Sequence, residues 1–339
     1  MWKYFLFLIF LITSCLPDKG KSDKERFFIR GNDKLKIREY KEAIYFYDEA
    51  IKKDPNYKLA YNNRAIAKYE SGNFHESVLD YNTAITLDPE YIDAYYNRSN
   101  AYAELGNYAR SLEDLEKVKE AWPDSAYVHF SQGLVYTQLK DYQKALEAFN
   151  KAKELDSQNV ETLVNIGTVK YYAKEYDQAF QYLNTAVNKD PKQANAYNVL
   201  GLIFSDKKEY NQALEYFNQA LKINGDQAFF LNNRGWVKIH LGDLDGAEED
   251  INRSITLDPF NGWAYRNKGV VFLKKEEPAA ALRVINRAIE LDEDIDLVYY
   301  FQGEVFIKMN KRQEACEAWQ KSESRSELEG QKKLVNYCK

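Results

Sequence analysis

The sequence predicts an all-α chain of about nine helix-turn-helix repeats, followed by a C-terminal capping helix. Two observations predict this fold. Glycines recur at one fixed interval from Gly133 to Gly303. Five of the seven prolines are also separated by multiples of that interval. These prolines are Pro55, Pro89, Pro123, Pro191 and Pro259. A fixed period of about 34 residues is typical of stacked repeats, each of which is too small to bury its own apolar face.

The period fixes a register that assigns a role to each position of the repeat. Position 8 is small in every repeat, for example Gly31 and Gly201, and position 20 is alanine or serine. Position 24 is large and apolar, for example Phe149. Small residues let two helix axes approach closely, while large ones fill the flanking space. The repeats are predicted to occupy residues 24–323 and to start at residues 24, 58, 92, 126, 160, 194, 228, 262 and 296.

Each repeat is expected to contain two short helices. Gly72, Gly106 and Gly242, at position 15, allow a tight turn between them. Leu-Asp-Pro sequences, such as the one that ends at Pro259, stop the second helix because proline is not tolerated in a helix interior. After the last repeat, residues 324–339 are predicted to form a capping helix. Its apolar stripe contains Leu328, Gln331, Val335 and Cys338, and we expect this stripe to cover the end of the stack.

The residues at positions 8, 20, 24 and 32 resemble those of the tetratricopeptide repeat (TPR), whose period is the same. The departures lie late in the chain, where Pro278 and Arg312 replace the aromatic residue of position 17. The resemblance implies a right-handed α-solenoid with the first helix of each repeat on the concave wall. In this family, positions 2, 5, 6, 9, 12 and 13 point into the groove.

The first fifteen residues predict export. Phe5 to Ile12 form an unbroken apolar run, which is too short to span a bilayer as a helix and fits the core of a signal peptide. The following Ile-Thr-Ser-Cys resembles the bacterial lipoprotein signal, which implies removal of residues 1–14 and lipidation of Cys15. Residues 15–23 then form a lipidated tether. Leu16 stands where an aspartate would favour the inner membrane, so the resemblance favours a lipid anchor in the outer membrane.

Composition argues against several other classes of function. Lys and Arg number 47 against 52 Asp and Glu, which leaves no basic excess for a nucleic-acid partner. Three histidines and three cysteines provide few ligands for a metal, and we expect neither a metal nor a cofactor. No dinucleotide loop, Walker loop, nucleophile elbow or zinc-protease motif is present, and the repeats leave no room for a catalytic domain. We therefore expect no enzyme activity.

Asparagine recurs at position 6, on the predicted concave wall. A side-chain amide both donates and accepts, so a row of amides could hold the backbone of an extended peptide of any sequence. The alternative is that asparagine recurs there for local capping or through repeat duplication. The asparagines are Asn63, Asn97, Asn165, Asn233 and Asn267.

Aromatic and charged residues complete the predicted peptide-binding groove. Exposed aromatic residues in a groove are typical anchors for a partner, although many could pack between neighbouring repeats instead. Charge on the wall is uneven: acidic residues lie in repeats 2 to 6, and basic residues, including Arg266, in repeats 8 and 9. This pattern would orient a ligand whose basic stretch lies toward the N-terminal repeats, unless the charges are simply solvated. The principal aromatic candidates are Tyr96, Phe130, Tyr171, Trp236 and Trp263.

One known use of the family is not expected here. Chaperone-tail binders clamp a terminal carboxylate with five residues, of which Asn32 and Asn63 match. Phe28, Asp93 and Asn97 replace the three basic ones, so the clamp should fail.

Two cysteines remain if Cys15 is lipidated. Cys316 and Cys338 could form a disulfide between the ninth repeat and the cap, as an even pair in an exported chain often does. Two buried thiols are the alternative, because spacing alone does not show how close the α-carbons lie.

Together these features predict a lipid-anchored binding scaffold at the bacterial cell envelope, on the periplasmic face or the cell surface, which holds a protein or an extended peptide in its groove. The membrane would be contacted through the lipid alone, and the residues do not indicate an oligomeric state. Two other functions stay open. The chain could be an architectural subunit that uses its convex face and edges, or a carrier that binds polysaccharide through the groove aromatics.

Overall fold

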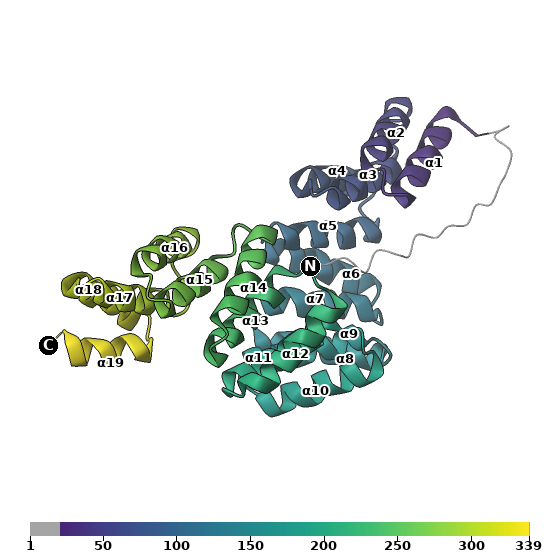
Figure 1. The fold of residues 1–339 in the computed structure, drawn as a ribbon. Helices are drawn as coiled ribbons and strands as arrows, with labels where there is room; N and C mark the ends of the chain where they lie inside the picture. The colour runs from purple at the N-terminus through teal and green to yellow at the C-terminus, as the bar shows by residue number, and fades with distance from the viewer. Residues whose placement is uncertain (1–20, 339) are drawn as a thin grey trace. The chain divides into compact units, whose positions relative to one another are not determined.

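The computed structural model describes residues 21–338, in which there are 19 α-helices and no strands (Figure 1). Consecutive helices pair as antiparallel hairpins, so that each odd-numbered helix is the first of a repeat and each even-numbered helix the second. The first helices are α1 (Asp23–Lys36), α3 (Lys58–Glu70), α5 (Ile92–Glu104), α7 (Ala126–Gln138), α9 (Val160–Tyr172), α11 (Ala194–Asp206), α13 (Ala228–Leu241), α15 (Gly262–Lys274) and α17 (Val298–Lys308).

The second helices begin at one constant interval throughout, which is the interval of the glycines. They are α2 (Tyr40–Lys53), α4 (Phe74–Leu87), α6 (Tyr108–Ala121), α8 (Tyr142–Leu155), α10 (Tyr176–Lys189), α12 (Tyr210–Ile223), α14 (Leu244–Leu257), α16 (Pro278–Leu291) and α18 (Arg312–Ser324). The terminal helix is α19 (Leu328–Tyr337). The all-α repeat fold predicted from the sequence is therefore confirmed.

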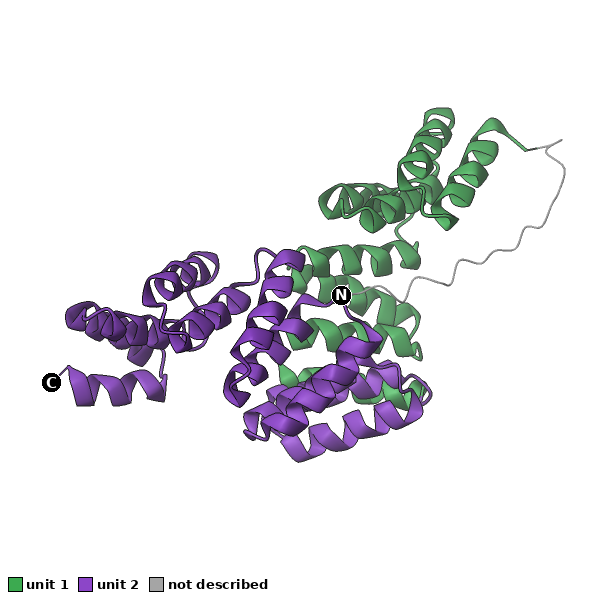
Figure 2. Cartoon of the chain, viewed as in Figure 1, with its two compact units in different colours: residues 1–156 green, residues 157–339 purple. Residues whose placement is uncertain are grey.

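The chain divides into two compact units, residues 1–156 and 157–339 (Figure 2). Unit 1 contains repeats 1 to 4. Unit 2 contains repeats 5 to 9 and α19.

Close packing within a repeat depends on the small residue at position 8. A Cβ added to Gly201 would lie 2.7 Å from the ring of Phe217, which is the position 24 residue of the same repeat. Gly133 has the same relation to Phe149, at 2.6 Å. In these repeats the two helices therefore touch across this pair, and a larger residue in place of either glycine would push them apart.

The turn between the two helices is left-handed at position 15 in all nine repeats. In three repeats the residue at this position is a glycine: Gly72, Gly106 or Gly242. Six other residues adopt it with φ between 58° and 63°, at a cost of about 1 kcal/mol each relative to glycine. These residues are Arg38, Lys140, Lys174, Lys208, Glu276 and Asn310.

The ninth repeat begins two residues later than the period predicts. α17 starts at Val298 rather than at residue 296, because Leu297 is left-handed, with φ 60°. Ile295, in the preceding turn, is buried and would meet a Cβ at Gly262. The turn therefore folds inward and shortens the helix.

Candidate partner-binding surface on the odd-numbered helices

The odd-numbered helices form the inner side of each unit. α1, α3 and α5 contact one another in sequence in unit 1, as do α9, α11, α13, α15, α17 and α19 in unit 2. Among the described helices, the extended contacts of even-numbered helices are all with odd-numbered ones. Helices that pack side by side lie on the inner side of a curved stack, and those that are splayed apart lie on its outer side. The predicted groove positions are all on odd-numbered helices.

Several of the predicted amides bond to another asparagine of the preceding repeat. In unit 1, Asn63 donates to the side chain of Asn32 at 2.8 Å, and Asn97 donates to Asn62 at 3.2 Å. Asn62 in turn donates to Asn63 at 3.1 Å. These bonds join repeats 1, 2 and 3, so the amides stabilise the stack and keep only part of their capacity for a ligand.

Unit 2 repeats this arrangement between adjacent odd-numbered helices. Asn233 donates to Asn198 at 3.0 Å, and Asn267 donates to Asn232 at 2.8 Å. Asn267 is only 1 % exposed, and its oxygen accepts from a neighbouring arginine, so it does not face a ligand as predicted. Asn165 differs from the others, because its amide donates only to the Glu161 carbonyl of its own helix, at 2.9 Å.

Arg266 lies between two tryptophans rather than in solvent. Its guanidinium carbon is 4.8 Å from the ring centroids of both Trp236 and Trp263, which is within the range of cation–π attraction. It donates to Asn267 at 3.0 and 2.6 Å and to the Asp296 carbonyl at 2.9 Å. Burial lowers the pKa of Arg266 to about 10, which leaves it charged at neutral pH. The predicted groove arginine is thus buried, and it holds Trp263 in place.

Trp263 is the most accessible of the predicted anchors in unit 2. It is 40 % exposed, whereas Trp236 is half-buried against Phe301 and His240. Tyr171, on α9, is also half-buried and packs against Tyr176.

In unit 1, Tyr127 is exposed and lies beside the predicted anchor Tyr96. Its ring is 5.0 Å from Tyr96 and 6.2 Å from Trp122, in edge-to-face geometry. Tyr96 is half-buried, and its hydroxyl lies 3.3 Å from Ser131. Phe130 packs on Phe149, at 5.5 Å between ring centroids, so it contributes more to the core than to the surface.

The acidic side chains that repeats 2 to 6 place on the inner surface are not neutralised by the fold. Glu70 and Glu104 accept from tyrosine hydroxyls at 3.4 and 3.5 Å, and Asp206 accepts from Tyr176 at 3.0 Å. None of them forms an ion pair with a cation in the part of the chain that the structure describes. Neighbouring side chains displace water from Asp93 and so raise its pKa. An incoming cation would therefore find these carboxylates available.

Phe28, Asn32 and Asn63, at three positions of the chaperone-tail clamp, make internal contacts. Phe28 packs against Tyr47 and Tyr57, with ring centroids 5.9 and 5.1 Å apart. Asn32 accepts from both Tyr47 and Asn63 at 2.8 Å. These residues therefore complete the core of the first repeats.

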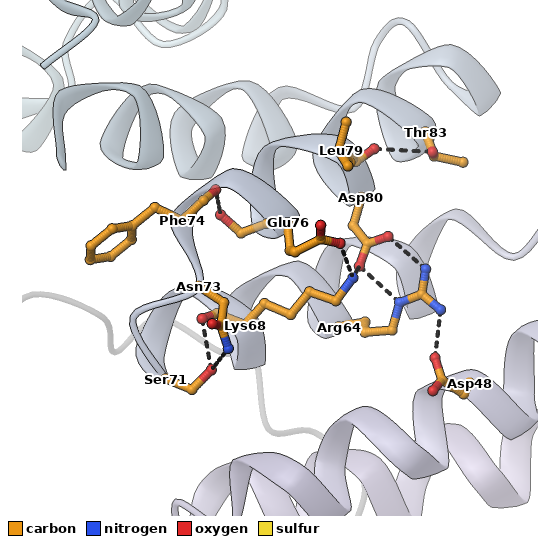
Figure 3. Close-up of polar contacts among 11 residues, drawn as sticks. Asp48, Arg64, Lys68, Ser71, Asn73, Phe74, Glu76, Leu79, Asp80 and Thr83 are labelled. Carbon is orange, nitrogen blue, oxygen red and sulfur yellow. Dashed lines mark hydrogen bonds and ion pairs between the residues drawn. The ribbon is translucent and has the colours of Figure 1, made fainter. Parts of the chain in front are cut away.

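Sequence reasoning missed a set of buried arginine–aspartate clamps. Arg64 on α3 donates to both oxygens of Asp80 on α4, at 2.8 and 2.6 Å, and also to Asp48 of the preceding repeat (Figure 3). Lys68 reaches the same Asp80 at 2.8 Å. The signal was visible as arginine at position 7 with aspartate at position 23 of the same repeat. It recurs in Arg98 with Asp114 and in Arg234 with Asp250.

The terminal helix is joined to the last repeat by a disulfide. Cys316 and Cys338 are bonded, with 5.8 Å between their α-carbons. The predicted packing face of α19 is wrong, however, because Leu328 and Val335 are 63 % and 54 % exposed. Leu334 is buried instead, together with Gly330. Lys333 pairs with Glu304 of α17 at 2.8 Å. The face of α19 that packs on the last repeat is therefore marked by Gly330, Lys333 and Leu334.

The described residues do not meet the requirements of a metal site or of a membrane-spanning helix. In the described part of the chain, no group of three His, Cys, Asp or Glu residues is placed to hold a metal ion. None of the described helices is both long and apolar enough to cross a bilayer. The predicted lipidation site Cys15 and the signal peptide lie outside the described residues.

Comparisons with known proteins agree with the geometry. Sequence models of the tetratricopeptide repeat match residues 67–106, 96–160, 158–226 and 232–296. No curated protein matches the chain in sequence.

Solved structures share the fold. A tetratricopeptide repeat protein from Parabacteroides merdae has a TM-score of 0.52 at 17 % identity, over 84 % of this chain and 99 % of that one. PilF of Pseudomonas aeruginosa has a TM-score of 0.53 at 24 % identity, over 63 % of this chain and 97 % of that one. MamA of Desulfovibrio magneticus has a TM-score of 0.48 at 20 % identity, over 51 % of this chain and 98 % of that one. The chain belongs to the tetratricopeptide-repeat family.

Proposed function

We propose that this chain is a non-enzymatic scaffold that holds a protein or peptide segment against its odd-numbered helices, as an adaptor or assembly factor at the bacterial cell envelope. One observation carries the proposal. The inner surface combines exposed aromatic rings with carboxylates that no described cation neutralises. Rings supply contact area at little entropic cost, and unneutralised charge selects the partner.

In unit 1 this surface fits a segment that carries a lysine or an arginine. Asp93 and Glu104 lie on α5, and Tyr127 follows on the neighbouring α7. The Asp93 carboxylate and the Tyr127 ring are close enough for the charge of one to raise the pKa of the other. A cation placed between them would gain an ion pair and a cation–π contact together.

The asparagines contribute less to ligand binding in this proposal than the sequence predicted. Asn165 is bonded only within its own helix and keeps its side-chain oxygen for a ligand. Asn63, Asn97 and Asn233 already donate one amide hydrogen each to the stack. We therefore assign peptide-backbone binding chiefly to Asn165.

Attachment to the envelope through Cys15 is the second half of the proposal. Its support is the sequence of the first fifteen residues, together with the bond between Cys316 and Cys338, since disulfides persist in exported proteins. Replacement of Cys15 by alanine should abolish metabolic labelling with an alkyne fatty acid and release the chain from membranes. A labelled, membrane-bound Cys15→Ala chain would contradict lipidation at this residue.

Charge reversal tests the binding surface. The double variant Asp93→Lys with Glu104→Lys should reduce capture of the native partner about tenfold, because two attractive charges become repulsive. The matched control, Glu113→Lys with Glu120→Lys, makes the same change on the exposed side of α6 and should leave capture unchanged. Loss in the control alone would indicate the architectural function. Binding to a glycan array that survives both changes would indicate the polysaccharide carrier.

A further inference from the structure

The imidazole of His240 is packed between aromatic rings but has no hydrogen-bond partner among the described residues. It lies in the last turn of α13, and its ring is stacked on Tyr210 with centroids 4.5 Å apart and an interplanar angle of 8°. Trp236 covers it from the side at 4.6 Å. The imidazole makes no hydrogen bond to any residue within 21–338, so its two nitrogens are held in a fixed plane without a partner.

The charged groups that act on His240 are all cationic. They are Lys208 in the turn before α12, Lys274 at the end of α15, and Arg266 behind Trp236. Burial and then these three charges lower the pKa of His240. The site is thus a local concentration of positive charge with aromatic walls.

The lysines next in sequence to Lys208 and Lys274 are paired with carboxylates, whereas Lys208 and Lys274 are not in the part of the chain that the structure describes. Lys207 pairs with Asp177 at 3.4 Å, and Lys275 pairs with Asp245 and Glu248 at 2.6 and 2.7 Å. Lys208 and Lys274 form no ion pair among the described residues. Each unpaired lysine is therefore next in sequence to one that the fold has neutralised.

A recess at Tyr210 gives room for a ligand group. It has a volume of about 320 Å³ and is bounded by Lys208, Tyr210 and Leu241, together with residues of the first turn of α12. Glu209 is the one carboxylate in its wall. The recess is open to solvent, and Tyr210, whose ring stacks on the imidazole, forms part of its wall.

We propose that Lys208, His240 and Lys274 form a binding site for the carboxylate of an acidic partner segment. This inference rests on the proposed function and specifies its chemistry in unit 2: the segment that reaches repeats 6 to 8 carries an aspartate or glutamate. Two flexible ammonium groups and an N–H of the imidazole are the donors. The aromatic rings of Tyr210 and Trp236 hold the imidazole in the plane that the carboxylate approaches.

Binding at this site is linked to pH. A bound carboxylate favours the imidazolium, so it raises the pKa of His240, and by linkage its affinity rises as the pH falls. We expect affinity to increase at least fivefold between pH 8 and pH 5.5. Screening by salt should weaken it, because the donors are partly solvated.

The test uses the full chain with histidine labelled at Cε1 and follows His240 by NMR as a function of pH. The probe is the peptide acetyl-Gly-Glu-Phe-Glu-Gly-amide, and its glutamine analogue is the control ligand. We expect the glutamate peptide to raise the pKa of His240 and the glutamine peptide to leave it unchanged. Equal responses to the two peptides, or no response to either, would overturn the inference.

Matched variants assign the response to the unpaired lysines. Lys208→Ala with Lys274→Ala should abolish the shift, whereas Lys207→Ala with Lys275→Ala should preserve it. The reverse result would overturn the assignment. A larger shift with an oligothymidylate than with the glutamate peptide would replace the acidic protein segment by a phosphate ligand.

The outcome is separable from that of the proposed function. If capture of the native partner depends on Asp93 and Glu104 but the glutamate peptide leaves the pKa of His240 unchanged, only this inference fails. If the peptide titrates His240 while the charge-reversed chain still captures its partner in full, the carboxylate site stands and the proposed inner surface of unit 1 fails.

Discussion

Replacement of Asp80 by alanine should destabilise unit 1 far more than removal of any surface charge. Asp80 is 5 % exposed and accepts three short bonds, two from Arg64 and one from Lys68 (Figure 3). The side chains of both cations are also largely covered, at 17 % and 16 % exposed. Without Asp80, two partly buried positive charges one turn apart on α3 would lose the carboxylate that they share.

The structure sets the size of this effect. Removing one partner of a buried ion pair typically costs about 3–5 kcal/mol. Arg64 retains Asp48, and some water reaches both cations, so we expect a loss of about 2–4 kcal/mol in the free energy of unfolding. Replacement of Arg64 by methionine together with Asp80 by leucine should restore part of the loss, because it removes one of the two unpaired cations and leaves Lys68 within 3.8 Å of Glu76.

Urea unfolding monitored by circular dichroism, with hydrogen exchange of the α3 and α4 amides, measures the change locally. Local measurement is needed because repeat arrays do not always unfold as one cooperative unit. Glu76→Gln is the matched control, since Glu76 is 63 % exposed and lies 3.8 Å from the same Lys68. It should cost less than about 0.5 kcal/mol. An Asp80→Ala chain as stable as the Glu76→Gln chain would refute the reasoning.

Three further outcomes follow from other parts of the fold. Reduction of the bond between Cys316 and Cys338, which closes a separation of 22 residues, should destabilise α18 and α19 by about 3 kcal/mol, seen as faster amide exchange there and not in α9. Gly201→Ala should cost about 1–3 kcal/mol in thermal unfolding, because its Cβ would lie 2.7 Å from Phe217, and a neutral result would contradict the close packing. The pKa of His240 is lowered in the folded chain, so the unfolded chain binds a proton first and stability should fall as the pH drops below 6.5. His240→Gln should flatten that decline, and an unchanged pH profile would exclude this cause.

The fold could be predicted because the same residue types recur at the same positions of each repeat. One constant interval fixes where the second helices begin, and the pairing of Gly133 with Phe149 shows why position 8 is small where position 24 is large. The turn was predicted less well. Lys174 and Lys208 adopt the left-handed conformation that glycine would adopt more easily, since stacking of the helices overrides the local preference.

The site was harder to predict because polar residues can satisfy one another. Asn267 and Arg266 were placed on the groove wall by position alone, but they bond each other, and Arg266 packs between two tryptophans. Spacing shows on which helix a residue lies and says nothing of whether its hydrogen bonds are already made. The Arg64–Asp80 clamp was missed for the same reason, because charged residues sixteen apart look like solvated surface until the helices are paired.

The face of α19 shows a further limit. Hydrophobic periodicity predicted that Leu328 and Val335 would be covered. The disulfide at Cys338 and the approach of Gly330 to Ser322 set the rotation of the helix instead, and both residues face outward. A covalent bond and one close contact outweigh a weak apolar stripe in a helix of ten residues.

The central claim is that partners bind the odd-numbered helices, and site-specific photocrosslinking in the native cell tests it most directly. A photoreactive phenylalanine analogue would replace Tyr127 on α7 or Trp263 on α15, and Leu79 on α4, which is 57 % exposed, serves as the control. The account predicts that the same partner is crosslinked at Tyr127 or Trp263 and not at Leu79. Crosslinking at Leu79 with none at the two aromatic positions would contradict it.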